Sequence, residues 1–99
     1  TCIALPYDIS TMDGISALAA EVAGREDNRL SILVNNAGAA WAAKFEEMPE
    51  SGWDKVVDLN MKTPFFLTQA LYPALKATAT EDQPAKVINI ASIDGLSLN

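Results

Sequence analysis

The sequence predicts an α/β fold built on a parallel sheet, and two observations support this prediction. Short apolar runs typical of buried strands alternate along the 99 residues with longer stretches whose apolar residues recur at helical spacing. The connections between the apolar runs are long enough to be helices, and helical crossovers join parallel strands. The order strand, helix, strand, helix, strand therefore predicts a sheet with helices on its faces.

The first third of the chain supplies a strand, a helix and a second strand. Residues 2–6 form a short apolar run that predicts the first strand. Ser10, followed three residues later by Asp13, predicts a helix cap before a single apolar stripe. Residues 30–34 predict the second strand, and its uninterrupted apolar core indicates burial on both faces.

The remainder predicts a longer helix and a third strand. An irregular stretch at 39–49 comes first, and Ser51 with Asp54 repeats the cap pattern at the start of the helix. A polar, acidic loop at 77–85 follows this helix. The apolar run at 87–90 predicts the third strand. We find no internal repeat or linker, so one domain is expected.

Composition excludes several classes of function. The chain is 49% apolar and 20% charged, with a net charge of −6, no histidine and a single cysteine, Cys2. Disulfides, cysteine-cluster metal sites and histidine-based catalysis are thereby excluded within these residues, and no metal site is expected. The acidic balance argues against nucleic acid as a partner. No apolar run reaches the length of a membrane span and no signal peptide is visible, so a cytoplasmic location is expected.

Polar residues follow the predicted strands at the edge where parallel sheets bind ligands. Asp8 follows the first strand, the run 35–38 (Asn-Asn-Ala-Gly) follows the second, and Ser92 follows the third. Ligands in such folds bind beyond the carboxyl ends of the strands. Polar residues also end strands for purely structural reasons, so each position keeps that second interpretation.

Asn60 lies inside the second helix, close to its apolar face. Pro64 stands four residues later and has no amide hydrogen, so it cannot donate the helical bond to the carbonyl of Asn60. The pair predicts a local bend and a main-chain carbonyl that can hold a water. The alternative is a simple proline kink with a solvated carbonyl.

Ser92 has no histidine anywhere in the chain to act as its base. A role as hydrogen-bond donor therefore fits this serine better than a role as nucleophile. The alternative is a serine that bonds its own backbone at the end of the strand.

Three segments together resemble the short-chain dehydrogenase/reductase family. They are 33–38 (Leu-Val-Asn-Asn-Ala-Gly), 53–60 (Trp-Asp-Lys-Val-Val-Asp-Leu-Asn) and 87–95 (Val-Ile-Asn-Ile-Ala-Ser-Ile-Asp-Gly). The resemblance implies a Rossmann-like doubly wound parallel sheet. It implies hydride transfer between a nicotinamide cofactor, NADP or NAD, and a carbonyl or alcohol substrate. A weaker similarity to the 3-oxoacyl-[acyl-carrier-protein] reductase-like branch favours NADP.

The resemblance also assigns roles to individual residues. Asp8 and Ile9 would contact the adenine of the cofactor, and Asn36, Ala37 and Gly38 would lie along its ribose. The remaining two assignments are catalytic. Ser92 would donate a hydrogen bond to the substrate carbonyl oxygen, and the main-chain carbonyl of Asn60 would hold a water of the proton relay.

Two motifs of the family, a glycine-rich turn and a catalytic Tyr-x-x-x-Lys pair, are interpreted as lying outside the chain, and neither Tyr7 nor Tyr72 is expected to replace the tyrosine. Residues 1–99 are therefore expected to be the central part of one NAD(P)-binding domain and inactive alone. In the family's sheet order, 3-2-1-4-5-6-7, they would supply strands 3, 4 and 5. The second and third runs would then be neighbours, although pattern alone favours pairing of the first two.

Other functions remain open at this point. A non-catalytic nucleotide-binding or scaffold protein could use the same fold, and a receiver or flavodoxin-like module is a third reading. The helix at 51–77 carries apolar residues on more than one face. By analogy with the family this helix predicts a homo-oligomer, a dimer or tetramer, and the alternative is burial within one subunit.

Overall fold

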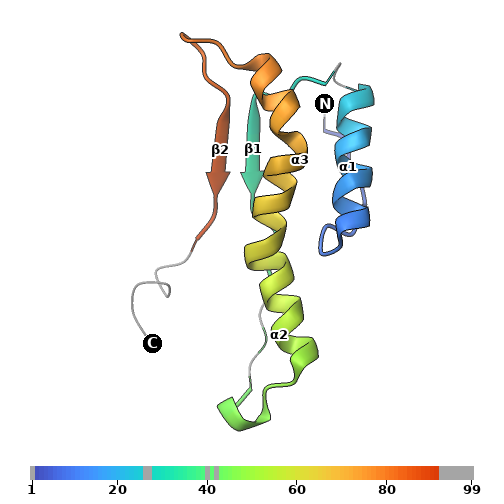
Figure 1. Cartoon of the computed structure of the whole chain (residues 1–99), viewed down its shortest axis with the longest axis vertical. Helices are drawn as coiled ribbons and strands as arrows, with labels where there is room; N and C mark the ends of the chain where they lie inside the picture. Colours follow the sequence, from blue (N-terminus) through green and yellow to red (C-terminus); the bar gives the residue numbers. More distant parts are fainter. Residues whose placement is uncertain (1, 26–27, 40, 42, 92–99) are drawn as a thin grey trace.

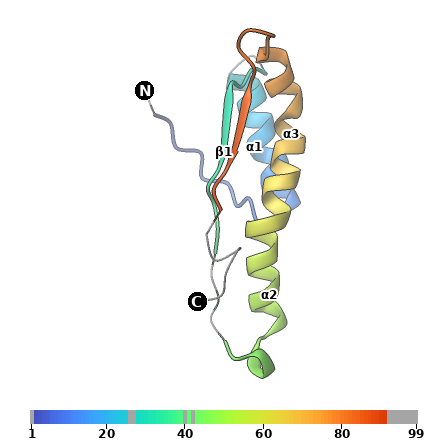
Figure 2. The ribbon, with the colours of Figure 1, turned by 90° about the vertical axis from the view of Figure 1, so that its left-hand side faces the viewer.

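Among the residues that the structure describes, the sheet has two parallel strands packed on one layer of helices. The structure is a computed structural model and describes residues 2–25, 28–39, 41 and 43–91. Figures 1 and 2 show the strands on one side and the helices on the other. The elements in order are α1 (Met12–Arg25), β1 (Ile32–Asn35), η1 (Phe45–Glu47), α2 (Glu50–Val57), η2 (Asp58–Lys62), α3 (Thr63–Thr78) and β2 (Lys86–Asn89).

The second and third predicted strands are neighbours, as the family order implies. β1 and β2 run parallel, with Leu33 opposite Val87 and Asn35 opposite Asn89. The connection between them is the long helix, which lies against the sheet in Figure 1. The long crossover and the parallel pairing therefore confirm the α/β class predicted from the sequence.

The first predicted strand does not form. Residues 2–6 are extended without ladder hydrogen bonds, and the amide of Tyr7 donates to the carbonyl of Leu5 at 2.9 Å in a tight turn around Pro6. A β-strand exists only when a neighbour accepts its backbone hydrogen bonds. No described strand lies beside this segment, and Ile3 is 57% exposed, so apolar composition alone does not make it a strand.

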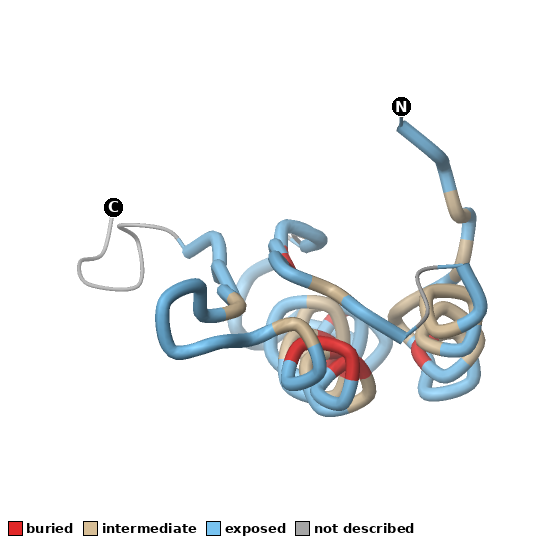
Figure 3. Tube along the Cα trace, turned by 90° about the horizontal axis from the view of Figure 1, so that it is seen from above, coloured by how far each residue is buried: buried red, intermediate tan, exposed pale blue. Residues whose placement is uncertain are grey.

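The core lies between the helices and one face of the sheet. Leucines four residues apart on α3 face α1 and β1, and α1 contributes from the opposite side. In Figure 3 the buried positions, drawn in red, lie mainly on the central helix. The buried cluster consists of Ile15, Leu33, Leu67, Leu71 and Leu75.

The other face of the sheet is open, which corrects the prediction of a strand buried on both sides. Leu33 is buried, but its neighbours Ile32 and Val34 are 54% and 49% exposed. Ile88 of β2 is exposed to a similar degree. The continuous apolar run is suited to a strand that is covered on both faces. The described residues cover only one face of β1.

Both predicted helix caps are displaced, the first by one residue and the second by two. Thr11 caps α1, because its hydroxyl oxygen accepts a hydrogen bond from the amide of Gly14 at 3.1 Å. Ser10 is unavailable because its amide and hydroxyl both bond to the carboxylate of Asp8. In the second helix Pro49, not Ser51, is the capping residue, and no side chain caps the helix.

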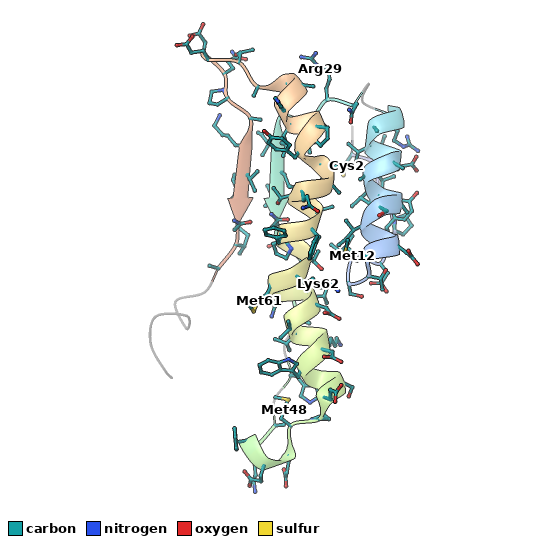
Figure 4. The ribbon with its side chains drawn as sticks, viewed as in Figure 1. Cys2, Met12, Arg29, Met48, Met61 and Lys62 are labelled. Carbon is teal, nitrogen blue, oxygen red and sulfur yellow. The ribbon has the colours of Figure 1, made fainter. Side chains whose placement is uncertain are left out.

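The segments α2, η2 and α3 form one long helix from Glu50 to Thr78, as the pattern predicts. Met61 and Lys62 mark the junction of its two halves in Figure 4. The five residues of η2 form a turn of π-helix. Despite this length, none of the helices among the described residues is both long and apolar enough to cross a membrane.

The 99-residue chain alone is expected to unfold without a sharp cooperative transition. The described residues leave one apolar face and both outer edges of the sheet uncovered, so the chain buries too little surface for its size to offset the entropy of ordering. Circular dichroism and calorimetry against temperature test this. A single two-state melt, with equal calorimetric and van't Hoff enthalpies, would contradict it.

Candidate functional site

A cleft of about 600 Å³ opens at the carboxyl ends of the two strands. This volume lies within the range of small-molecule and cofactor sites. The segment after β1 forms one wall, the long helix the second and the end of β2 the third. The lining residues are Asn35, Asn36, Ala37, Gly38, Asn60, Pro64, Asn89, Ile90 and Ala91.

The cleft brings together four of the predicted site residues. Asn36, Ala37 and Gly38 come from the turn after β1, and Asn60 comes from the helix. Ser92 lies outside the described residues, although Ala91, which precedes it, lines the cleft. Of the predicted site residues that the structure describes, all but Asp8 and Ile9 therefore line this cleft at the ends of the strands.

Asn60 is attached to the wall of the cleft by both ends of its side-chain amide. Its oxygen accepts a hydrogen bond from the amide of Ala39 at 3.0 Å, and its nitrogen donates to the carbonyl of the same residue at 2.9 Å. A primary amide can satisfy a donor and an acceptor of one peptide unit in this way. The side chain of Asn60 therefore holds the loop after β1.

The main-chain carbonyl of Asn60 is the second functional group at this position. Pro64 cannot donate to it, and its ring would collide with a helical carbonyl four residues earlier. The helix widens here into the π turn, where the amide of Thr63 reaches back five residues to the carbonyl of Asp58. The proline thus produces a widened turn around Asn60 where the sequence predicted a bend.

Gly38 leaves the space that Asn60 occupies. A Cβ atom built on Gly38 would lie 2.9 Å from the side-chain oxygen of Asn60, closer than a carbon and an oxygen normally approach. A glycine at this position therefore allows the loop after β1 to contact Asn60 of the helix. Its backbone φ is not positive, so close approach and not turn geometry explains the residue.

Asn35 belongs to the run 35–38 predicted at the ligand edge, but the sequence assigned it no role of its own, and it supports the floor of the cleft. Its side chain is 8% exposed, and its amide donates to the side-chain oxygen of Asn89 at 2.8 Å and to the hydroxyl of Thr68 at 3.3 Å. One buried amide thus links β1, β2 and α3. An asparagine inside an apolar strand next to a second asparagine was the available signal.

Ile9 lies at a smaller recess beside the cleft, whereas Asp8 precedes it in the chain and lines neither space. Ile9 lines this recess with Asn36, Ala37 and Leu59. The hydroxyl and the amide of Ser10 bond to Asp8 and hold the pKa of that carboxyl below its ordinary value, so it is ionised at neutral pH. The recess shares Asn36 and Ala37 with the cleft, which places the turn at 8–9 next to the predicted ribose contacts.

Two aromatic residues of the irregular stretch do not reach the cleft. Trp41 lies over Gly52 of α2, where an added Cβ would be 2.7 Å from its ring. Phe45 is 99% exposed on η1. The contact of Trp41 is therefore with α2.

Tyr72 is set aside as the catalytic tyrosine by its position in the fold, and not by its spacing from a lysine. It is followed four residues later by Lys76, so spacing does match a Tyr-x-x-x-Lys pair. The position in the fold excludes it from the cleft, because Tyr72 lies about 18 Å along the helix from Asn60 at about 1.5 Å per residue. Tyr72 lines a separate groove against β2 with Phe65, Thr68 and Val87.

A parallel sheet with a cleft at its carboxyl edge is typical of α/β proteins of the Rossmann type. The profile of the family described as short chain dehydrogenase matches residues 1–98, and the chain belongs to that family. The resemblance seen in the motifs is thereby confirmed.

Curated relatives show what kinds of protein share the sequence. The chain is 46% identical over 96 residues to the rhamnolipids biosynthesis 3-oxoacyl-[acyl-carrier-protein] reductase of Pseudomonas aeruginosa, covering 97% of this chain and 37% of that protein. It is 40% identical over 91 residues to the 2-dehydro-3-deoxy-D-gluconate 5-dehydrogenase of Escherichia coli, covering 92% and 34%. The chain therefore spans little more than a third of the length of these relatives.

Solved structures show the same fold. The NADP active-site complex of Pseudomonas aeruginosa RhlG superposes with a TM-score of 0.88 at 44% identity, covering 96% of this chain and 37% of that one. The NADPH-bound carbonyl reductase from chicken fatty liver superposes with a TM-score of 0.84 at 33% identity, covering 94% and 38%. The described part of this chain is thus a partial Rossmann-fold domain.

Replacing Gly38 by alanine is expected to destabilise the full-length protein by about 1 kcal/mol, the net contribution of a typical hydrogen bond, because Gly38 and Asn60 are exposed and the displaced amide can bond to water. The added methyl group would displace the amide of Asn60 from Ala39. Gly24→Ala is the matched control, because no atom lies within 4 Å of its Cβ position and alanine favours a helix. Denaturant unfolding measures both. Equal stability of the two variants would contradict the contact.

Proposed function

We propose that the protein containing this chain is an NAD(P)-dependent oxidoreductase that transfers hydride between the nicotinamide and a carbonyl or alcohol. The observation that carries the proposal is the convergence of Asn36, Ala37, Gly38 and Asn60 on one cleft at the ends of the strands. The fold alone would not support an activity. Here the residues that the family pattern assigns to cofactor and proton relay are neighbours in space.

The cleft fits a dinucleotide on the side that the chain supplies. Small residues at 36–38 leave a wall that a ribose can approach, and the turn at 8–9, which adjoins them, would contact the adenine. The carboxylate of Asp8 is ionised and can accept from an amino group. When bound, the cofactor would supply or accept the hydride.

The chain's own residues would handle the proton and the substrate oxygen. Pro64 has no amide hydrogen to donate to the carbonyl of Asn60, so this carbonyl would accept a hydrogen bond from a water that relays a proton. The side chain of Asn60 fixes the position of this carbonyl by its two bonds to Ala39. Ser92 would donate a hydrogen bond to the substrate oxygen and stabilise negative charge developing there.

We also propose that residues 1–99 are the central part of one NAD(P)-binding domain and do not turn over substrate alone. The coverage of just over a third of each relative supports this extent. Relatives include an NADP complex and a 3-oxoacyl-[acyl-carrier-protein] reductase, which favours NADP and a ketone substrate. Because a sugar-acid dehydrogenase is also similar, the proposal stops at the carbonyl or alcohol class. A cytoplasmic location is proposed with it.

Replacing Ser92 by alanine in the full-length enzyme is expected to lower kcat about 10²–10³-fold, the usual cost of removing one donor to a developing oxyanion. Binding of NADPH should be unchanged, as measured by fluorescence titration. Ser51→Ala, at the exposed start of α2, is the control and should keep full turnover.

Two results would contradict this account. A turnover of Ser92→Ala equal to that of Ser51→Ala would remove Ser92 from the mechanism. Binding of NADPH by the full-length protein without oxidation in the presence of any tested ketone would favour the non-catalytic nucleotide-binding alternative.

The long helix supports the proposal of a homo-oligomer. Leu67, Leu71 and Leu75 face the core, whereas Phe65 and Tyr72 are 64% and 57% exposed on another face. The two-faced pattern predicted from the sequence is therefore present. The exposed face lines a groove of about 460 Å³ against β2.

Replacing Tyr72 by glutamate is expected to shift the full-length protein to a smaller assembly in light scattering, because a carboxylate is costly to bury in an apolar contact. Thr80→Glu, in the exposed loop before β2, is the control for added charge. A monomeric wild-type protein would overturn the proposed oligomer and favour burial of this face within one subunit.

A further inference from the structure

The side chain of Thr63 joins two parts of the candidate site that are distant in sequence. It is 3% exposed, and its hydroxyl lies 2.6 Å from the carbonyl of Ile9 and 2.6 Å from the carbonyl of Asp58. Ile9 belongs to the turn before α1, whereas Asp58 begins the π turn that contains Asn60. No residue role was assigned to Thr63 from the sequence.

One hydroxyl hydrogen serves these two acceptors, and the chemistry of each decides where it goes. The carbonyl of Asp58 already accepts the backbone amide of Thr63. The carbonyl of Ile9 is part of a loop and needs a donor when it is removed from water. The hydroxyl of Thr63 is therefore best used as the donor to Ile9, with Asp58 as a secondary contact.

The turn at 8–9 is held from two sides. On one side, Asp8 packs on α1: its carbonyl accepts the hydroxyl of Thr11 at 3.2 Å. A Cβ atom on Gly14 would collide with that carbonyl. On the other side, Thr63 holds the next carbonyl against the long helix. The helical turn that carries Asn60 thus also fixes the turn that borders Asn36 and Ala37 at the recess.

We propose that Thr63 is a positioning residue for the adenine end of the nucleotide. Its hydroxyl fixes the turn at 8–9 against the long helix and ties it to the π turn that presents Asn60. This inference rests on the proposed function, because it takes the turn at 8–9 as the adenine contact. Thr63 itself lines the recess beside Ile9, which at about 40 Å³ is too small for an adenine, so its inferred role acts through the position of the turn.

The test compares variants that separate the hydroxyl from the shape of the side chain. Thr63→Val removes the donor and keeps the volume, whereas Thr63→Ser keeps the donor. Thr78→Val is the matched control, because Thr78 also donates from α3 to a backbone carbonyl, that of Ala74 at 3.1 Å, but at the far end of the helix. All are made in the full-length protein.

The readout is binding of two halves of the cofactor, 5′-AMP and nicotinamide mononucleotide, measured separately by calorimetry. Thr63→Val is expected to weaken AMP about tenfold, the scale of an unmade hydrogen bond that leaves a buried acceptor. Its affinity for nicotinamide mononucleotide should change less than about twofold. Thr63→Ser and Thr78→Val should keep both affinities.

The outcomes separate this inference from the proposed function. AMP affinity of Thr63→Val equal to that of Thr78→Val would overturn the role of Thr63 and leave the oxidoreductase proposal standing. Equal loss of both fragments would also overturn it, because a general loosening of the fold would then explain the effect. A wild-type protein that binds neither AMP nor NADPH would overturn both proposals.

If Thr63→Val does not fold, Thr63→Cys replaces it, since a thiol is a weak donor. Wild-type AMP affinity in that variant would be the overturning result.

Discussion

The missing amide hydrogen of Pro64 is the constraint on which the site depends. A regular α-helix through this point would require a donor that proline lacks and would press its ring against the carbonyl of Asn60. The helix relieves both problems by widening over Asp58–Lys62 into a π turn. Because the turn is wide, Asn60 can bond across to Ala39 on one side and Thr63 can reach Ile9 on another.

Neutral hydrogen bonds, and not ion pairs, assemble the site. Asn60, Asn35 and Thr63 each bond to a group in another element, and two of them bond to backbone atoms. The one ion pair between described residues, Arg25 with Glu21, lies on α1 away from the cleft. Such bonds fix positions without adding charge next to a nucleotide. The absence of histidine from the sequence is therefore compatible with the proposed chemistry.

The parts of the structure that follow from neighbouring residues could be predicted, and the parts that follow from distant ones could not. The apolar stripe on α3 and the helix distortion before Pro64 depend on neighbouring residues, and both appear where the sequence pattern predicts them. The strand expected at 2–6 depends on a partner strand, which the run itself does not encode. One local feature was also missed, because the carboxylate of Asp8 bonds to Ser10 and the cap of α1 moves to Thr11. The contact of Thr63 with Ile9 spans 54 residues, beyond any local pattern.

The register of the two strands explains why the floor of the cleft is polar. Asn35 and Asn89 are direct partners at the ends of β1 and β2, and their side chains share a hydrogen bond of 2.8 Å. A slip of one residue would set the amide of Asn35 opposite Ile88 or Ile90 and leave it buried without this partner. Leaving an amide buried without a hydrogen-bond partner costs more free energy than shifting an apolar side chain on the exposed outer face of the sheet. The same pair that penalises slippage therefore also aligns the strand ends, so Asn36, Ala37 and Gly38 enter the cleft beside Ile90 and Ala91.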